Sequence, residues 1–192
     1  FFTNEPGNTL KDRFNTLVGG TALFDCLVGY FYSSGFHAIY PALENTENIR
    51  ILIGISTSND TLKIIEDGKK LIQQELKYSH SETKQTIEHA IENEMENSKD
   101  TRNVEAGVHK FIEWIRSGKL KVKAYPSQNI HAKLYIMTFK EGSIDKGRVI
   151  TGSSNFTKSG LEGNLEFNVE LKNSGDYKFA KEKFDELWKD AV

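Results

Sequence analysis

Apolar residues gather in short runs along the chain, and these runs predict the strands of a sheet. The segment 49–55, IRILIGI, is apolar at nearly every position, which is typical of a strand buried on both faces. The segment 22–32 is also dense in apolar and aromatic residues and predicts a second buried strand. Shorter runs, some of them alternating between apolar and polar positions, predict further strands at 120–125, 132–139, 148–152 and 165–171.

Between these runs, apolar residues spaced three and four apart predict amphipathic helices. They fall on one helical face at 8–18, 33–43, 60–78, 104–116 and 176–188. The segment 81–99 has only a narrow apolar stripe, so we expect 79–103 to form a partly buried helical arm or an insertion. Strands that alternate with helices in this way indicate an α/β fold, in which helices cover a mixed sheet.

Length and composition fit a single domain spanning residues 1–192. The chain is 38% hydrophobic and 27% charged, and both values are ordinary for a globular protein. No apolar run approaches the roughly 20 residues that a membrane-spanning helix needs, so no membrane partner is expected. The single cysteine, Cys26, cannot form an internal disulfide, which favours a cytoplasmic location. Because the chain begins with Phe1 rather than Met, we expect it to be a fragment of a longer protein, and the family resemblance given below implies that it is the N-terminal part.

The formal charge is nearly balanced, at −2, which argues against a protein that coats DNA by charge alone. Positive charge is nevertheless concentrated between residues 110 and 133, where six basic residues stand against one acid, Glu113. A phosphate-binding site would need such a field. A solvated, lysine-rich helix end and strand would give the same pattern, so the charge leaves both interpretations open.

His131 and Lys133 stand two residues apart at the opening of the strand predicted at 132–139. Residues i and i+2 of a strand project from the same face, so the imidazole and the ammonium are expected to lie together. An imidazole can attack phosphorus or exchange a proton near neutral pH, and an ammonium can stabilise charge on phosphoryl oxygens. Taken alone, an H-x-K triplet is more often a histidine at the edge of the core beside a solvated lysine.

Two further segments supply groups suited to the same chemistry. The turn TGSSN at 151–155 has a glycine that allows a ligand to approach, and hydroxyl and amide groups that can bind phosphate oxygens. Glu166, in the next predicted strand, can accept a hydrogen bond from the second imidazole nitrogen and so fix the tautomer of the histidine. Glu170 lies on the same strand face and competes for this role.

The phospholipase D superfamily carries an H-x-K-x4-D motif, followed by G-S-x-N and then by an acid. This chain resembles that pattern in order and spacing, at His131, Lys133, Gly152, Ser153, Asn155 and Glu166. The segment 28–36, VGYFYSSGF, resembles the first strand and turn of nuclease-type members, so the resemblance covers most of the chain outside 60–102. It implies a phospholipase D-like α-β-α sandwich with a mixed sheet.

The resemblance also implies how the site works. The reaction proceeds in two steps through a phosphohistidine, without a metal or another cofactor. Superfamily sites place two motifs face to face, whereas this chain carries one, so the resemblance implies a homodimer that shares one active site, or a second motif outside this sequence. The catalytic residues are then His131, Lys133, Ser153, Asn155 and Glu166. We further predict substrate contacts from Gly152 and Ser154 in the turn and from Lys123 and Tyr125 in the basic segment.

Two features depart from the pattern of the superfamily. Thr138 stands where the motif has its aspartate, a loss with parallels in the restriction-endonuclease branch, which the chain resembles more than the lipases. The stretch between Lys133 and Gly152 is also longer than usual, and EGS at 141–143 with DKG at 145–147 predicts a hairpin there.

The leading hypothesis is a metal-independent nuclease that acts on DNA rather than RNA, as a module of a restriction enzyme or a helicase-like protein. The chain has no Walker A loop, so a fused or associated helicase or ATPase would lie outside it. The alternative is a catalytically weakened module that binds nucleic acid or a protein partner. A phospholipid hydrolase is less favoured, because the chain is short, has one motif and lacks an interfacial apolar helix.

Overall fold

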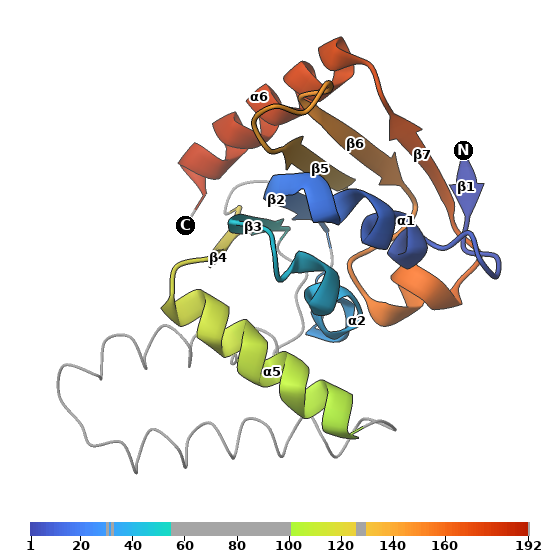
Figure 1. The fold of residues 1–192 in the computed structure, drawn as a ribbon, viewed down its shortest axis with the longest axis vertical. Coiled ribbons are helices and arrows are strands. Elements are labelled where there is room, and N and C mark those ends of the chain that lie inside the picture. Colours follow the sequence, from blue (N-terminus) through green and yellow to red (C-terminus); the bar gives the residue numbers. More distant parts are fainter. Residues whose placement is uncertain (30, 32, 55–100, 126–129, 192) are drawn as a thin grey trace, which may run out of the picture.

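The described residues form one sheet of seven strands, in the order β1-β7-β6-β5-β2-β3-β4. The computed structural model describes residues 1–29, 31, 33–54, 101–125 and 130–191 (Figure 1). The helices predicted at 60–78 and 81–99, with most of the predicted arm, lie outside these residues. The strands are β1 Phe2–Thr3, β2 Thr21–Val28, β3 Asn48–Ile53, β4 Leu120–Ala124, β5 Lys133–Phe139, β6 Gly147–Gly152 and β7 Phe167–Leu171.

The sheet combines parallel and antiparallel pairs. β2 is parallel to β3, and β3 is parallel to β4. β5 runs antiparallel to β2, and the pairs β5–β6, β6–β7 and β7–β1 are antiparallel as well. The carboxyl ends of β2, β3 and β6 therefore lie at the same end of the sheet as the amino ends of β5 and β7. The predicted α/β fold with a mixed sheet is confirmed.

Each strand predicted from an apolar run is present, with its ends shifted by a few residues. The largest difference is in the segment 22–32, because β2 ends at Val28 and α2 begins at Ser33. Gly29 follows β2 directly, and a Cβ there would lie 2.8 Å from the carbonyl oxygen of Ile130. β1 was not predicted, since two residues carry no periodic signal.

The α-helices of the described residues are α1 Leu10–Leu17, α2 Ser33–Leu43, α5 Thr101–Arg116 and α6 Ser174–Asp190. α1 begins with a capping box, in which the Asp12 amide donates to Thr9 Oγ1 at 3.0 Å and the Thr9 amide donates to the Asp12 carboxylate at 3.1 Å. Asn173 caps α6 by accepting from the Gly175 amide at 2.7 Å. A short π-helix, η2 Ser159–Gly163, follows β6 and was not predicted.

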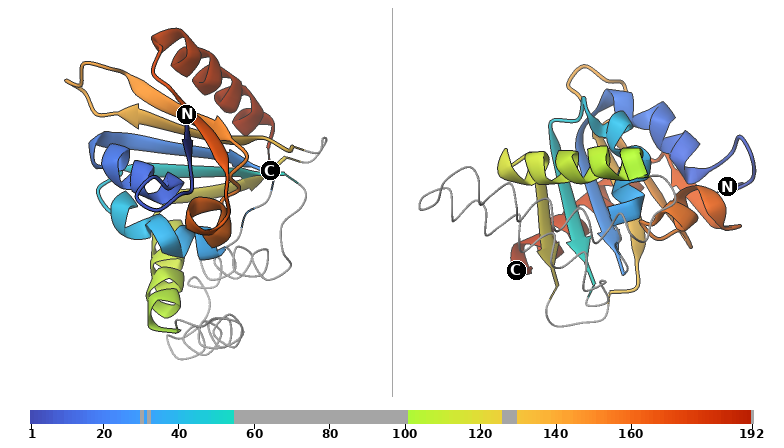
Figure 2. Two further views of the ribbon diagram at one scale, coloured as in Figure 1. Left: turned by 90° about the vertical axis from the view of Figure 1, so that its right-hand side faces the viewer. Right: turned by 90° about the horizontal axis from the view of Figure 1, so that it is seen from below.

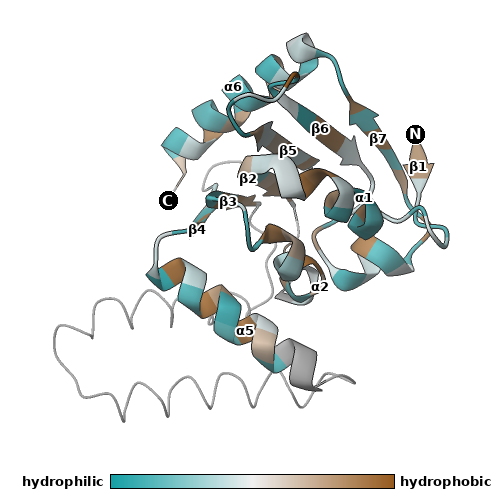
Figure 3. Cartoon of the chain, viewed as in Figure 1, coloured by the Kyte–Doolittle hydropathy of each residue, from teal (hydrophilic) through white to brown (hydrophobic). Residues whose placement is uncertain are grey.

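Helices cover both faces of the sheet. α1, α2 and α5 lie on one face and α6 lies on the other, as the left view of Figure 2 shows. The face under α1, α2 and α5 holds the larger core, in which the rings of Phe14, Phe24 and Tyr135 pack against one another. Leu27 and Ile136 belong to a second cluster under α6. Figure 3 accordingly shows hydrophobic stretches on the strands and, along α5, hydrophobic positions that alternate with hydrophilic ones.

A cluster of charged residues joins α6 to the sheet. Asp25 of β2 is fully buried, and it accepts hydrogen bonds from Arg50 of β3 at 2.6 and 2.7 Å. Lys181 of α6 lies 3.3 Å from the same carboxylate. Asp185, one turn further along α6, bonds Arg50 at 2.7 Å and Lys181 at 2.8 Å. The Arg50 guanidinium also lies over the Phe184 ring, 4.9 Å from its centroid.

The predicted hairpin joins β5 to β6 at residues 140–146. Strand pairing places Thr138 opposite Gly147, so this hairpin lies at the end of the sheet away from the start of β5. Gly142 has a φ of 88°, a conformation that glycine adopts without strain. Ile144 is fully exposed, and Asp145 pairs with Arg148 at the base of the hairpin.

Candidate active site

The predicted catalytic residues come from adjacent strands at one end of the sheet. Leu134 of β5 pairs with Thr151 of β6, and Gly152 of β6 pairs with Asn168 of β7. Neighbouring strands are about 4.8 Å apart. This register therefore places the segment entering β5 beside the segment leaving β6, and both beside the segment entering β7.

His131 and Lys133 lie together, as their spacing predicts. Lys133 is the first residue of β5 and only 9% exposed, whereas His131 precedes the strand and is exposed. The Lys133 ammonium lies 3.4 Å from each ring nitrogen of His131, and it donates to the His131 carbonyl at 3.2 Å. A buried stem with a charged tip beside an accessible imidazole is suited to binding an anion at the end of the sheet.

Two glycines allow the backbone before His131 to lie against the ends of β2 and β3. The Gly29 amide donates to the Ala132 carbonyl at 3.1 Å, which continues the β2–β5 ladder beyond β2. A Cβ on Gly54 would lie 2.5 Å from the Ile130 carbonyl oxygen, closer than real Cβ contacts occur. Side chains at these positions would displace residue 130 and with it His131. Sequence inspection missed this role, because the contact joins segments far apart in the chain.

Ser153 and Glu166 form a hydrogen-bonded pair. The Ser153 hydroxyl donates to the Glu166 carboxylate and accepts from the Phe167 amide at 3.0 Å. The Ser153 amide in turn donates to the Phe167 carbonyl at 3.0 Å. The other Glu166 oxygen accepts from Asn164 at 3.5 Å. Glu166 is thus held toward the turn that follows β6.

Asn155 contributes a half-buried amide to the same turn. Its Oδ1 is buried and has no hydrogen-bond partner among the described residues. A flip of the amide exchanges this oxygen with the NH₂ group, so the position can present either an acceptor or two donors. The Asn155 backbone is fixed, because its carbonyl accepts from the Thr157 amide at 2.8 Å.

Ser154 has a different environment from its two neighbours. It is fully buried, its hydroxyl accepts from Asn168 at 2.9 Å, and its carbonyl accepts from the Tyr135 hydroxyl at 2.8 Å. A side chain in this position cannot contact a substrate, so we leave Ser154 out of the proposed binding residues. Gly152 is exposed, and a Cβ there would lie 2.2 Å from the Phe167 carbonyl oxygen, so only glycine fits between β6 and β7.

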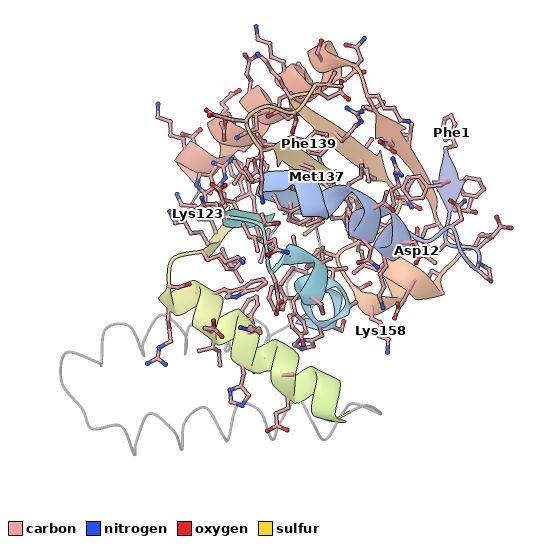
Figure 4. The ribbon with its side chains drawn as sticks, viewed as in Figure 1. Phe1, Asp12, Lys123, Met137, Phe139 and Lys158 are labelled. Carbon is pink, nitrogen blue, oxygen red and sulfur yellow. The ribbon has the colours of Figure 1, made fainter. Side chains whose placement is uncertain are left out.

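Lys123 and Tyr125 lie in and just after β4, at the far edge of the sheet from β6 and β7. The Lys123 ammonium donates to the carbonyls of Trp188 and Ala191, at 3.0 and 2.7 Å, where it caps the C-terminal end of α6 (Figure 4). Tyr125 packs against the cluster under α6. These contacts are structural, so we do not retain either residue as a substrate ligand.

The basic segment 110–133 does not form one surface at the site. Lys110 pairs with Glu113 at 3.0 Å on α5, and Lys119 donates to the Glu44 carbonyl at 2.7 Å. With Lys123 also engaged, Lys133 is the member of the segment that lies at the site. Three of the six bases therefore make contacts away from the site, and the pattern of bases does not by itself indicate a phosphate-binding surface.

Glu170 and Thr138 both lie away from His131. Glu170 forms ion pairs with Arg13 at 2.6 Å and with Arg148 at 3.3 Å, so it is engaged with α1 and β6. Thr138 is near the other end of β5, where its hydroxyl shares a 2.8 Å hydrogen bond with the Tyr177 hydroxyl of α6. Of the two carboxylates considered for the site, Glu170 lies within β7, and Glu166, just before β7, is the one held at the His131 end of the sheet.

A hollow of about 820 Å³ opens elsewhere, between α1 and η2. Its lining includes two bases, Lys11 and Lys158, and two acids, Asp12 and Glu162; Figure 4 labels Asp12 and Lys158. Lys11 and Glu162 pair at 2.8 Å. The charges balance, so this hollow offers no net attraction for a polyanion.

Within the described residues, no three or more His, Cys, Asp or Glu side chains are grouped so that they could hold a metal ion. None of the helices in the described part of the chain combines the length and the apolar character needed to cross a bilayer.

Comparisons with known proteins identify the family. The family model described as cardiolipin synthase, PLD-like domain, matches residues 32–188. NucT from Helicobacter pylori has a similar structure, with a TM-score of 0.50 at 11% identity over 95% of this chain and 89% of that one. Nuc from Salmonella typhimurium, a phospholipase D family member, gives 0.47 at 14% identity, over 94% and 87% of the two chains. A search of curated proteins found no match. Since the family model covers more than half of its length, the chain belongs to the phospholipase D superfamily as a PLD-like domain.

Proposed function

We propose that this chain hydrolyses phosphodiester bonds in DNA. The observation that carries the proposal is the accessible His131 imidazole beside the Lys133 ammonium, at the end of the sheet where Ser153 and Glu166 are also held. An imidazole can act as the nucleophile of a phosphoryl transfer, and an ammonium and a hydroxyl can stabilise charge on the phosphoryl oxygens.

The proposed reaction has two steps and uses the His131 side chains of two chains. One imidazole attacks phosphorus, and the bond to the leaving oxygen breaks while the second imidazole gives that oxygen a proton. Water then attacks the phosphohistidine, passes a proton to the second imidazole, and the phosphorus–nitrogen bond breaks. Lys133 and the Asn155 amide bind the phosphoryl oxygens during both steps, and Ser153 joins them when its hydroxyl turns from Glu166 to the substrate.

We infer that the complete site is shared by a homodimer. The sequence holds one H-x-K motif, and the reaction needs two imidazoles. His131 is exposed at the end of the sheet, which supports its approach to a second copy around a two-fold axis. A second motif outside this sequence would serve equally, and size measurements distinguish the two arrangements.

The location of Thr138 supports activity in spite of the missing motif aspartate. Thr138 is five residues along β5 from Lys133, a distance of roughly 16 Å at about 3.3 Å per residue. Its side chain contacts α6, whereas Tyr135, two residues after Lys133 and on the same strand face, belongs to the core under α1, α2 and α5. A carboxylate at position 138 would therefore not reach the reacting groups of its own chain.

The preference for DNA rests on the resemblance of the segment 28–36 to nuclease-type members of the superfamily. Because the loss of the motif aspartate at Thr138 has parallels in the restriction-endonuclease branch, we propose that the chain is a module of a restriction enzyme or works with a helicase-like partner. A module that binds nucleic acid without cleaving it, and a phospholipid hydrolase, are the alternatives that the experiment must separate.

The test is cleavage of supercoiled plasmid DNA in EDTA by the wild type and by His131→Ala. His109→Ala is the matched control, because His109 is exposed on α5, away from the site. We expect cleavage by the wild type and by the control, and none by His131→Ala. DNA binding without cleavage by the wild type would refute the nuclease, and release of headgroups from phospholipid vesicles in a parallel assay would assign the lipid reaction instead.

A further inference from the structure

The strand that carries Lys133 also holds the turn that carries Ser153 and Asn155. The contact is the hydrogen bond from the Tyr135 hydroxyl to the Ser154 carbonyl, 2.8 Å long and fully buried. Ser154 lies between the two residues proposed to bind phosphoryl oxygens. The position of its carbonyl therefore determines where both neighbours present their side chains.

Strand geometry explains why the Tyr135 hydroxyl can reach the Ser154 carbonyl. It follows Lys133 by two residues, so the two side chains project from the same face of β5. Asn168 of β7 follows Glu166, which stands just before β7, by two residues, and the Asn168 amide donates to the Ser154 hydroxyl at 2.9 Å. Ser154 is thus hydrogen-bonded to both flanking strands, through Tyr135 of β5 and Asn168 of β7. Each of these residues follows a proposed catalytic residue by two positions.

Packing does not require the Tyr135 hydroxyl. The ring is fully buried between Phe14 and Phe156, with centroids 5.1 and 6.2 Å away, and phenylalanine would fill the same space. A hydroxyl in such surroundings is unfavourable unless it is hydrogen-bonded. Burial, with the nearby Cys26 and Glu166, raises the pKa of Tyr135 well above its ordinary value, so the group stays a protonated donor.

We propose that Tyr135 is a positioning residue, which fixes the 153–155 turn relative to Lys133 through the Ser154 carbonyl. The proposal rests on the proposed phosphodiesterase function. Groups that bind the phosphoryl oxygens act mainly on the transition state, so misplacing them lowers kcat more than it changes KM. A displacement of about 1 Å lowers the rate by up to about 10²-fold.

Tyr135→Phe is the test, with Tyr177→Phe as the matched control. The control also removes a hydroxyl from a 2.8 Å hydrogen bond, but it does so between α6 and Thr138, away from the site. In cleavage of a fluorescent oligonucleotide we expect kcat to fall about 10- to 100-fold in Tyr135→Phe, with KM within about threefold of the wild type. We expect Tyr177→Phe to keep the wild-type kcat.

A second measurement is independent of activity. The backbone amide resonances of Ser153 and Asn155 should shift in Tyr135→Phe and stay in place in Tyr177→Phe. A Tyr135→Phe enzyme with kcat within twofold of the wild type would overturn the proposal, as would losses of equal size in both variants. If the wild type cleaves no phosphodiester, the proposed function fails. Unchanged amide resonances in Tyr135→Phe would separately reject the positioning of the turn by the Tyr135–Ser154 hydrogen bond.

Discussion

Gly54→Ala adds a methyl group where the chain has no space for one. The new Cβ would lie 2.5 Å from the Ile130 carbonyl oxygen, and ordinary van der Waals contact begins at 3.4 Å, so the two must separate by about 0.9 Å. The obstacle is backbone rather than a flexible side-chain end, and Ile130 is bonded directly to His131. We therefore expect the imidazole to move by a comparable distance.

A misplacement of about 1 Å in a reacting group lowers the rate by about 10²-fold, equivalent to about 2.7 kcal/mol of transition-state stabilisation. The assay is steady-state cleavage of a labelled oligonucleotide, with thermal unfolding measured on the same samples. Gly19→Ala is the control, because nothing lies within 4 Å of a Cβ at Gly19. Activity of Gly54→Ala within about threefold of the wild type, in a folded protein, would show that Gly54 does not set the position of His131.

Further predictions concern the charged cluster under α6 and the motif position on β5. Asp25→Ala leaves Arg50 and Lys181 without their buried partner and should lower the free energy of unfolding by about 3–5 kcal/mol in urea titrations; Asp185→Ala, at a half-exposed site, should lower it by at most about 1 kcal/mol. Partial burial raises the pKa of Asp185, but its pairing with Lys181 and Arg50 outweighs burial, so the pKa is lowered on folding. The stabilisation from this carboxylate is therefore present above the unfolded-state pKa of about 4 and is lost as pH falls through the lower folded-state pKa. The difference in unfolding free energy between the wild type and Asp185→Asn should accordingly shrink in acid titrations. Thr138→Ala should keep kcat within about twofold of the wild type, because roughly 16 Å separates this position from Lys133; a tenfold loss would contradict the placement of the site.

Periodicity predicted strands β2 to β6 well, because each of them buries apolar positions on at least one face. The i, i+2 rule also predicted that His131 and Lys133 lie together. It could not predict which residue of one strand lies opposite which residue of the next. Pairing between strands decides that Ser154 faces the core between Tyr135 and Asn168, and no local pattern in the sequence encodes it.

Two candidate assignments lose support in the structure for the same physical reason. Lys123 looked like a phosphate ligand because it is basic and close in sequence to His131, but β4 lies at the edge of the sheet and its lysine caps α6. Glu170 was a credible partner for the histidine until Arg13 and Arg148 were seen to pair with it. In each case a charged side chain forms its hydrogen bonds or ion pairs with an element distant in sequence.

The hairpin between β5 and β6 can change in length without moving the proposed catalytic residues. Both strands of this pair have one end at the site and the other end at residues 140–146, so residues added at the hairpin lengthen the chain without changing the pairing of Leu134 with Thr151. The fully exposed Ile144 marks a place for a peptide epitope or a fluorophore. A label inserted there would report on assembly in solution while leaving the reacting groups untouched.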